Sequence, residues 1–211
     1  MKRSIANAIS KKNRDRKYKY FKERVGFTAD TKVLDVGFAN HEFSPIDNYL
    51  EKHYPFRAKI TALGVGGKDE FTKNYPDVET VLYDGKIFPF ADKTFDIGWS
   101  NAVIEHVGGK DRQLLFLKEL LRTCRTVYFT TPNVYFPVEL HTRTLFLHWL
   151  PKTFFDRYLR RIGKSWAAGD YMYLLSKKRI IDLCREAGAQ NVTIKGNRLF
   201  GFVMDYSVII T

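Results

Sequence analysis

The chain has 211 residues, 45% of them hydrophobic, so it is long and apolar enough to bury a core and does not have the composition of a disordered protein. No stretch approaches the roughly 18–20 uninterrupted apolar residues of a membrane span, and the basic N-terminus lacks the apolar core of a signal peptide. The two cysteines, Cys124 and Cys184, form neither a metal-type spacing nor a disulfide framework. We therefore expect one globular domain in the reducing cytoplasm, with peripheral attachment to a membrane left open.

The formal net charge is +12, and much of it is concentrated at the N-terminus. Residues 1–25 hold ten Lys and Arg against Asp15 and Glu23, which gives this segment +8 and leaves +4 for the rest. We predict a basic helical arm over 1–25, followed by the main domain over 26–211. Such an arm suits an anionic partner, namely a membrane surface, a nucleic-acid backbone or a phosphorylated substrate, although it is equally typical of a solvated helix.

Strand and helix patterns alternate along the main domain. Apolar and β-branched runs ended by turn residues predict strands, and a 3.6-residue period with capping residues predicts helices. Ser44-Pro45 is a good helix start. The predicted helices cover 4–24, 44–53, 112–122 and 176–187, and the predicted strands cover 33–36, 59–63, 78–83, 95–100, 125–130, 192–195 and 202–210.

This alternation predicts an α/β fold with a mostly parallel sheet and helices on both faces. The last two strands are joined without room for a crossover helix, so they must be antiparallel to each other. Residues 132–175 interrupt the pattern with an aromatic segment much longer than a usual connection. We interpret this segment as an inserted lid, and additional core is the alternative.

The first strand of the main domain ends in Asp35-Val36-Gly37. In open α/β sheets, ligands bind beyond the carboxyl ends of the strands, and a glycine there allows a tight turn close to a ligand. Asp35 would supply a negative charge suited to a cationic ligand. This turn alone is a weak signal, because many α/β domains have one for structural reasons.

A second, longer motif lies at residues 88–107. It combines Phe88-Pro89-Phe90, Asp92, Phe95-Asp96 at a strand start, Ser100 near its end and then Glu105-His106-Val107. Together with the Asp35-Val36-Gly37 turn, this segment closely resembles class I S-adenosylmethionine-dependent methyltransferases, specifically the type 11 group that includes quinone-biosynthesis enzymes. The resemblance spans about residues 30–131.

The resemblance implies a three-layer Rossmann-like methyltransferase sandwich with a seven-stranded, mostly parallel sheet and an antiparallel C-terminal strand. It implies S-adenosylmethionine as cofactor. By position, the residues implied to bind it are Asp35, Gly37, Phe38 and Ala39 at its amino-acid end, Gly64 at the ribose position, Asp84 and Gly85 at the adenine, and Ser100, Asn101 and Ala102 near the sulfonium.

The chain departs from the family pattern at three places. Only the first glycine of the usual Gly-x-Gly-x-Gly turn is kept, in Gly37-Phe38-Ala39-Asn40-His41. Gly64 stands where relatives carry an acid for the ribose hydroxyls. Ala102 stands three positions before Glu105, where some quinone methyltransferases carry a metal-binding acid, so we expect no metal.

The sequence offers several residues for chemistry on the methyl acceptor. The catalytic candidates are His106, His141 and Glu105, because an imidazole can accept the acceptor's proton near neutral pH and all three follow predicted strands. The substrate-binding candidates lie beyond the fifth strand of the main domain and in the lid: Asn133, Glu139, Trp149, Trp166 and Tyr171. Structural roles as helix caps, scaffold or core remain the alternative for each.

These residues predict a methyltransferase that methylates an oxygen of a small-molecule, lipid-linked or glycan-type acceptor. The basic arm keeps an RNA methyltransferase open as an alternative. The missing glycines and ribose acid keep a non-catalytic binding protein open as well.

Overall fold

A computed structural model describes residues 2–211, with side chains from residue 8 onward. The chain divides into two compact units. The first contains the residues up to Ser100, residues 119–128 and Thr211, and the second contains residues 101–118 and 129–210.

One sheet of seven strands has the order β3-β2-β1-β4-β5-β9-β8. Strand β1 pairs in parallel with β2 and β4, and β2 pairs in parallel with β3, whereas β8 and β9 are antiparallel. The predicted α/β sheet and the antiparallel C-terminal pair are therefore confirmed. The strands are β1 (Val33–Val36), β2 (Ile60–Gly64), β3 (Glu79–Leu82), β4 (Phe95–Asn101), β5 (Cys124–Pro132), β8 (Val192–Leu199) and β9 (Phe202–Ile210).

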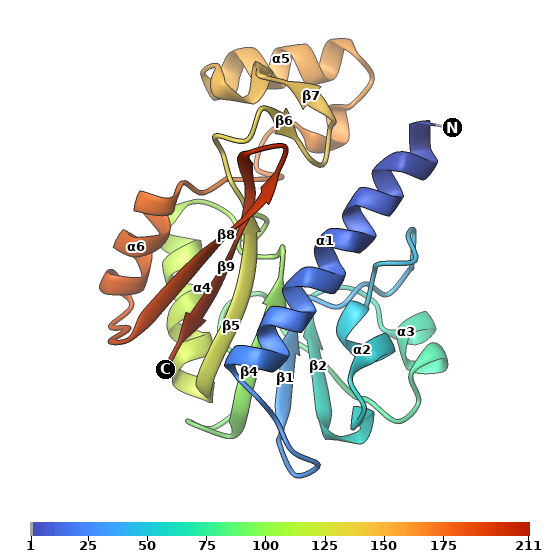
Figure 1. The fold of residues 1–211 in the computed structure, drawn as a ribbon, viewed down its shortest axis with the longest axis vertical. Coiled ribbons are helices and arrows are strands. Elements are labelled where there is room, and N and C mark those ends of the chain that lie inside the picture. Colours follow the sequence, from blue (N-terminus) through green and yellow to red (C-terminus); the bar gives the residue numbers. More distant parts are fainter. Residues whose placement is uncertain (1) are drawn as a thin grey trace. The chain divides into compact units, whose positions relative to one another are not determined.

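In the first unit, helix α1 (Lys2–Arg24) runs across the sheet (Figure 1). Its Phe21 is fully buried, with its ring centroid 4.8 Å from that of Trp99 and 5.1 Å from that of Tyr128. Tyr18 is also buried and lies edge-on to Trp99. The C-terminal half of the basic helix therefore contributes to a core, while the division of the chain at residue 25 stays a prediction.

The helix predicted over 44–53 is shorter than expected, since α2 covers only Tyr49–His53. The Asp47 carboxylate accepts hydrogen bonds from the backbone N–H groups of Phe43 and Ser44, which holds these residues in turns instead. Asn48 precedes the helix in a left-handed conformation, with φ of 48°. The prediction that this helix starts at Ser44-Pro45 was wrong, because side chains bonding to nearby backbone compete with helix formation.

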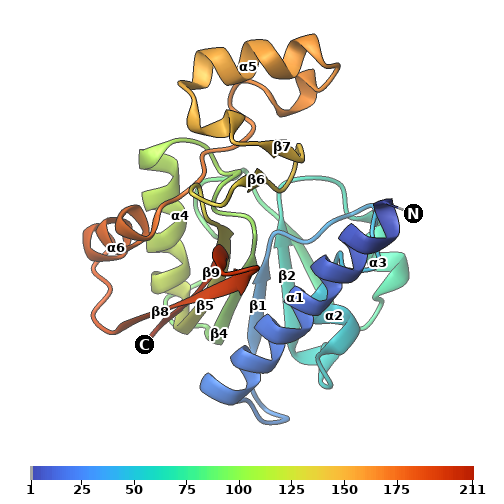
Figure 2. The ribbon, with the colours of Figure 1, turned by 45° about the horizontal axis from the view of Figure 1, so that its top comes forward.

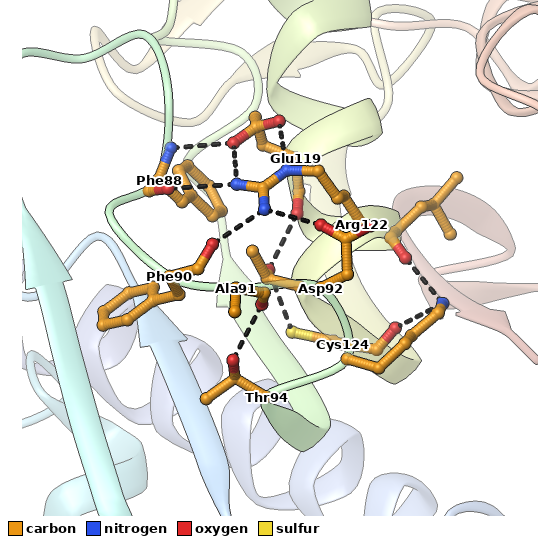
Figure 3. A network of polar contacts seen from close by, with 11 residues as sticks. Phe88, Phe90, Ala91, Asp92, Thr94, Glu119, Arg122 and Cys124 are labelled. Atoms are coloured by element: carbon orange, nitrogen blue, oxygen red, sulfur yellow. Dashed lines mark hydrogen bonds and ion pairs between the residues drawn. The ribbon is translucent and has the colours of Figure 1, made fainter.

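Arg122 organises the segment that carries the Pro-Phe-acid part of the motif (Figure 3). Its guanidinium donates to the carbonyl oxygens of Phe88 and Phe90, and it forms ion pairs with Asp92 and with the buried Glu119. Glu119 in turn accepts a hydrogen bond from the Phe88 N–H. The planar guanidinium can donate to several acceptors at once. The Pro-Phe-acid motif therefore stabilises the fold, in addition to marking the resemblance to the family.

The second unit contains α6 (Lys177–Glu186), most of α4 (Lys110–Thr123) and the inserted segment. Helix α6 begins where predicted, with Ser176 as its N-cap accepting from the Arg179 N–H, and Gly188 follows it with φ of 84°. The inserted segment is built from the short antiparallel strands β6 (Val138–Glu139) and β7 (Thr144–Leu145) and from helix α5 (Lys152–Arg161) (Figure 2).

The sequence patterns missed four elements, namely strands β6 and β7 and helices α5 and α3 (Asp69–Asn74). Helix α3 is capped by Asn40, whose Oδ1 accepts from the N–H groups of Glu70 and Phe71. None of the helices in the described part of the chain has the length and apolar character needed to cross a membrane.

Candidate functional site

The turn after β1 is held by its own backbone and by one asparagine. Gly37 has a φ of 103°, a conformation that favours glycine, and its N–H donates to the Leu63 carbonyl. Asn48 brackets Ala39, since its Oδ1 accepts from the Ala39 N–H and its Nδ2 donates to the Ala39 carbonyl, both at 2.8 Å. Sequence reasoning missed Asn48, whose two hydrogen bonds hold the backbone of Ala39, the residue at the position of the second glycine in the family pattern.

Phe38 and Gly64 form a matched pair at the predicted ribose position. A Cβ on Gly64 would lie 2.6 Å from Phe38 Cε1, closer than real atoms approach. The Phe38 ring also packs on buried Phe71, with centroids 4.3 Å apart. The acid of the family pattern is therefore absent because an aromatic ring fills its space.

Asp35 is buried in the structure and is not exposed as a ligand-binding carboxylate would be. Its side chain is buried and faces the Glu51 carboxyl of α2, whose two oxygens have no hydrogen-bond partner apart from this contact. Burial, reinforced by Glu51, raises the pKa of Asp35 well above its usual range, and burial likewise raises the pKa of Glu51. Arg14 partly offsets the effect on Asp35. Burial and mutual repulsion therefore favour protonation of this carboxyl pair, and direct contact of Asp35 with the cofactor stays a prediction.

This carboxyl pair predicts how stability depends on pH. Because the folded-state pKa values are raised, the native state binds more protons than the unfolded chain, so stability falls as pH rises above the ordinary carboxyl pKa. Glu51→Gln removes one negative charge and leaves Asp35 with Arg14. We expect its melting temperature to exceed that of the wild type at pH 8 by a few degrees, at about 2–4 °C per kcal/mol for a chain of this length, and by less at pH 5. Glu23→Gln, at an exposed carboxylate, is the control, and a variant less stable than wild type at pH 8 would contradict the interpretation.

Asp84 and Gly85 follow β3 as predicted. Asp84 is exposed, and its Oδ1 accepts from the Lys86 N–H while Oδ2 has no partner among the described residues. Gly85 has a φ of 78°. At the end of β4, buried Ser100 donates to the Val36 carbonyl at 3.1 Å, which ties the ends of β4 and β1 together. The first unit thus presents an open carboxylate oxygen and exposed turn backbone at the carboxyl edge of its parallel strands.

Asn101 and Ala102 belong to the second unit. Asn101 Oδ1 accepts from Thr130 Oγ1 at 2.7 Å, and the Ala102 N–H donates to the Thr130 carbonyl. Ala102 has a φ of 59°, which is uncommon for a residue with a Cβ and is often found near functional sites.

The second unit brings the three catalytic candidates together. His106 Nε2 lies 3.1 Å from His141 Nε2, and donor atoms of Glu105, His106 and His141 all lie within 4.8 Å of one another. Buried Glu139 holds His141 through a 2.7 Å contact with its Nδ1 and one with its backbone N–H. We call Glu105, His106 and His141 the Glu-His-His cluster. Sequence reasoning named its members but did not predict that they meet.

Glu139 and His141 change each other's pKa. Burial opposes the charged form of both partners, but the hydrogen bonds from His141 and Thr142 lower the pKa of Glu139 to about 2. The same carboxylate outweighs burial at His141 and raises its pKa. Glu105 is held by Thr131, whose hydroxyl donates to Oε2 at 2.9 Å.

The substrate candidates divide into scaffold and surface. Asn133 is buried and bridges the backbone of Val203 and Tyr135, so it acts as scaffold. Tyr171 joins the cluster, since its ring lies 4.8 Å from that of His106 and its carbonyl accepts from His106 Nδ1. Trp149 and Trp166 are half exposed, and the latter lies edge-on to Tyr171. Their roles toward an acceptor stay predictions.

The strand order 3-2-1-4-5-9-8 with an antiparallel final pair defines a Rossmann-like methyltransferase fold. The family model of the methyltransferase domain matches residues 56–126. That stretch is similar to S-adenosylmethionine-dependent methyltransferases of the type 11 group, and the rest of the chain shares their fold.

Solved structures resemble the chain at low sequence identity, which shows the fold. A methyltransferase from Methanosarcina mazei is 13% identical with a TM-score of 0.52, over 87% of this chain and 93% of that one. One from Aquifex aeolicus is 17% identical with a TM-score of 0.52, over 92% and 88%. Phosphoethanolamine N-methyltransferase 2 of Haemonchus contortus, solved with S-adenosylmethionine, is 14% identical with a TM-score of 0.55, over 86% and 38%. No curated protein matches the chain in sequence.

S-adenosylmethionine is the cofactor that the methyltransferase-domain match implies, and the first unit fits it in part. The unpartnered Oδ2 of Asp84 suits the exocyclic amine of adenine, and the exposed Gly37 leaves the turn after β1 accessible to the amino-acid end. The ribose hydroxyls lack a carboxylate at Gly64, where the Phe38 ring lies instead.

Proposed function

We propose that this methyltransferase transfers the methyl group to a hydroxyl oxygen of a lipid-linked acceptor at an anionic membrane surface. The observation that carries the proposal is that the inserted segment exposes many large apolar side chains together with basic ones. Its large apolar members, each 37–60% exposed, are Leu145, Phe146, Trp149, Leu150, Phe154, Tyr158, Ile162 and Trp166. We call this set the lid face.

Helix α5 illustrates why the lid face differs from an ordinary helix surface. Its inner side buries Phe155 and Leu159 against Met172 in a small core. Its outer side nevertheless exposes Phe154 and Tyr158, one helical turn apart. A helix on the surface of a globular domain normally presents polar residues to water. Exposed apolar side chains on the outer side of α5 therefore indicate a binding surface.

Basic residues are exposed in the same segment as these apolar side chains. Arg157, Arg160, Arg161 and Lys152 are exposed on α5, and Arg143 is exposed beside β7. Aromatic and aliphatic side chains that enter the headgroup region, ringed by Lys and Arg that bind lipid phosphates, are the combination by which interfacial helices bind anionic membranes. A lipid surface therefore suits this face better than a nucleic acid, for which exposed Leu and Ile offer nothing.

The proposed methyl transfer needs residues that hold the cofactor and residues that activate the acceptor. The cofactor supplies an electrophilic methyl group when bound, and the residues that would hold it are the turn at Gly37–Ala39 and Asp84. The Glu-His-His cluster would activate the acceptor oxygen, either by taking its proton on an Nε2 or through an ion held there. In-line transfer then depends on alignment of oxygen and methyl and on exclusion of water, for which an inserted lid is suited.

The acceptor class is tested with methyl-labelled cofactor and fractionated cell extract. We expect label in the lipid fraction. Label in RNA would overturn the proposal in favour of the RNA methyltransferase, and label in no fraction, together with no cofactor binding by calorimetry, would favour a non-catalytic protein.

The membrane surface is tested by co-sedimentation with vesicles. We expect the wild type to bind vesicles that contain anionic lipid and to bind neutral vesicles weakly. Phe154→Asp places a carboxylate on the lid face and should reduce binding at least tenfold. Phe43→Asp is the matched control, because Phe43 is 92% exposed in the first unit and should tolerate the change. Equal losses in both variants would contradict a role for the lid face.

A further inference from the structure

The hydrogen-bond partners of the two histidines in the Glu-His-His cluster fix which ring nitrogens carry protons. His106 Nδ1 lies 2.9 Å from the Tyr171 carbonyl oxygen, which can only accept, so Nδ1 donates. His141 Nδ1 lies 2.7 Å from a Glu139 oxygen. Glu139 also accepts from the Thr142 N–H and hydroxyl, which marks it as an ionised acceptor. His141 Nδ1 therefore donates as well.

It follows that both Nε2 atoms of the neutral imidazoles present lone pairs. A neutral imidazole has one donor and one acceptor nitrogen, and both donors are already engaged. Yet the two Nε2 atoms face each other at 3.1 Å. Two lone pairs at this distance repel, so the arrangement calls for a positive species between them, either a proton on one Nε2 or a metal cation.

Glu105 supplies an independent observation. Its side chain is completely buried, and Oε2 accepts from the Thr131 hydroxyl. Oε1 is buried too and has no hydrogen-bond partner among the described residues. A buried carboxylate oxygen without a partner is costly, because it loses hydration and gains nothing in return. One carboxylate oxygen of Glu105 lies within 4.8 Å of donor nitrogens of both histidines.

We infer that Glu105, His106 and His141 bind a divalent transition-metal ion, which deepens the proposed function. Ions such as Zn²⁺ bind imidazole nitrogen at about 2.0–2.1 Å, so nitrogens 3.1 Å apart can both bind one ion with an angle of about 100°. Glu105 Oε1 provides the third, charged ligand. The sequence led us to expect no metal because Ala102 replaces an acid, but His141 from the lid supplies a donor that spacing within the motif could not reveal.

The surroundings orient the ligands as metal sites require. A ligating histidine usually donates its other ring nitrogen to a carboxylate or backbone carbonyl, which fixes its tautomer and ring orientation. Glu139 does this for His141, and the Tyr171 carbonyl does it for His106. Glu139 and Thr131 are thus positioning residues that hold ligands.

The types of ligand indicate which ions would bind and what a bound ion would do in the reaction. Two imidazoles and one carboxylate suit zinc, cobalt, manganese or iron(II) better than magnesium or calcium, which prefer oxygen ligands. Three protein ligands leave coordination positions open. A hydroxyl oxygen of the acceptor bound there would have its pKa lowered and would become the better nucleophile for methyl transfer.

Metal binding is measured on the full chain, stripped with chelator and titrated with Zn²⁺ by calorimetry and with Co²⁺ by visible absorption. We expect one ion per chain. Glu105→Gln, His106→Gln and His141→Gln should each weaken binding by more than the roughly 10–100-fold typical of a lost outer-shell partner, and Glu139→Gln should fall within that range. No binding by the wild type, or binding that the three ligand variants leave intact, would overturn the inference.

The control is His41→Gln, since His41 is an exposed histidine that pairs with Glu70 at 2.7 Å and should not affect metal binding. Circular dichroism establishes that each variant is folded, and Glu105→Gln is nearly isosteric, so a loss of binding reflects the ligand. The metal titration needs no methyl acceptor. A bound ion without methyl transfer would therefore count against the proposed function alone, and methyl transfer that persists without any bound ion would count against the metal alone.

Discussion

Replacing Gly64 with aspartate, the type of residue that the family pattern places there, is expected to destabilise the protein. The new Cβ would lie 2.6 Å from Phe38 Cε1. The Phe38 ring would have to leave its contact with Phe71, and its neighbours would shift. Overpacking of this kind costs about 1–3 kcal/mol, which corresponds to about 2–4 °C of melting temperature per kcal/mol for this chain length.

The same substitution should become favourable once the ring is removed. In Phe38→Ala/Gly64→Asp, the carboxylate has the space that the ring vacates and can accept hydrogen bonds from the ribose hydroxyls. Hydrogen bonds to a charged group contribute about 1.5–3 kcal/mol, so we expect the double variant to bind S-adenosylmethionine roughly 10–100-fold more tightly than Phe38→Ala alone.

Calorimetry with the cofactor and thermal melting measure both effects. Phe38→Ala/Gly64→Asn is the matched control, because it fills the space without the charge and should gain much less affinity. If Gly64→Asp alone melts like the wild type, the ring does not determine the residue at position 64. If the double variant binds no more tightly than Phe38→Ala, position 64 does not face the ribose.

The sequence predicted the parts of the fold that depend on local patterns. Strand β1 was predicted with its observed bounds, because Val33–Val36 is a short apolar run closed by a turn glycine. Helix α6 was predicted with its cap, since Ser176 and Gly188 are local signals. The start of α2 was predicted wrongly because the Asp47 carboxylate accepts from the N–H groups of Phe43 and Ser44 and holds them in turns, a competition that helix-capping patterns do not record.

The candidate site was predictable as a set of residues and not as an arrangement. Glu105 and His106 are adjacent in a recognisable motif, but His141 reaches His106 across 35 positions of the chain. That contact depends on the β6–β7 pair, whose strands of two residues each are too short to give a periodic pattern. The steric relation between Phe38 and Gly64 could not be predicted for a related reason. In the sequence, the missing acid at Gly64 and the aromatic residue at Phe38 look like two separate differences from the family pattern, and only the structure shows that they are in contact.

The second large effect concerns the Glu-His-His cluster. His106→Ala and His141→Ala are each expected to lower the rate of methyl transfer by about 10²–10⁴-fold, because each removes a group needed to activate the acceptor's hydroxyl. Cofactor affinity should change little, because the turn and carboxylate that would hold the cofactor are built from the first unit. Transfer of labelled methyl to the extract fraction that accepts it measures the rate, and calorimetry measures the affinity.

The two histidines should behave as one unit. Their Nε2 atoms lie 3.1 Å apart and would bind the same ion, so removing either one disables the pair, and the double variant should be no slower than the worse single variant. His148→Gln is the control within the lid, since the His148 ring bonds to the Val134 carbonyl and lies outside the cluster. Losses that multiply in the double variant would mean that the two imidazoles act on separate steps. In that case the close approach of their nitrogens would serve packing, and the activation of the acceptor would have to be sought at another group.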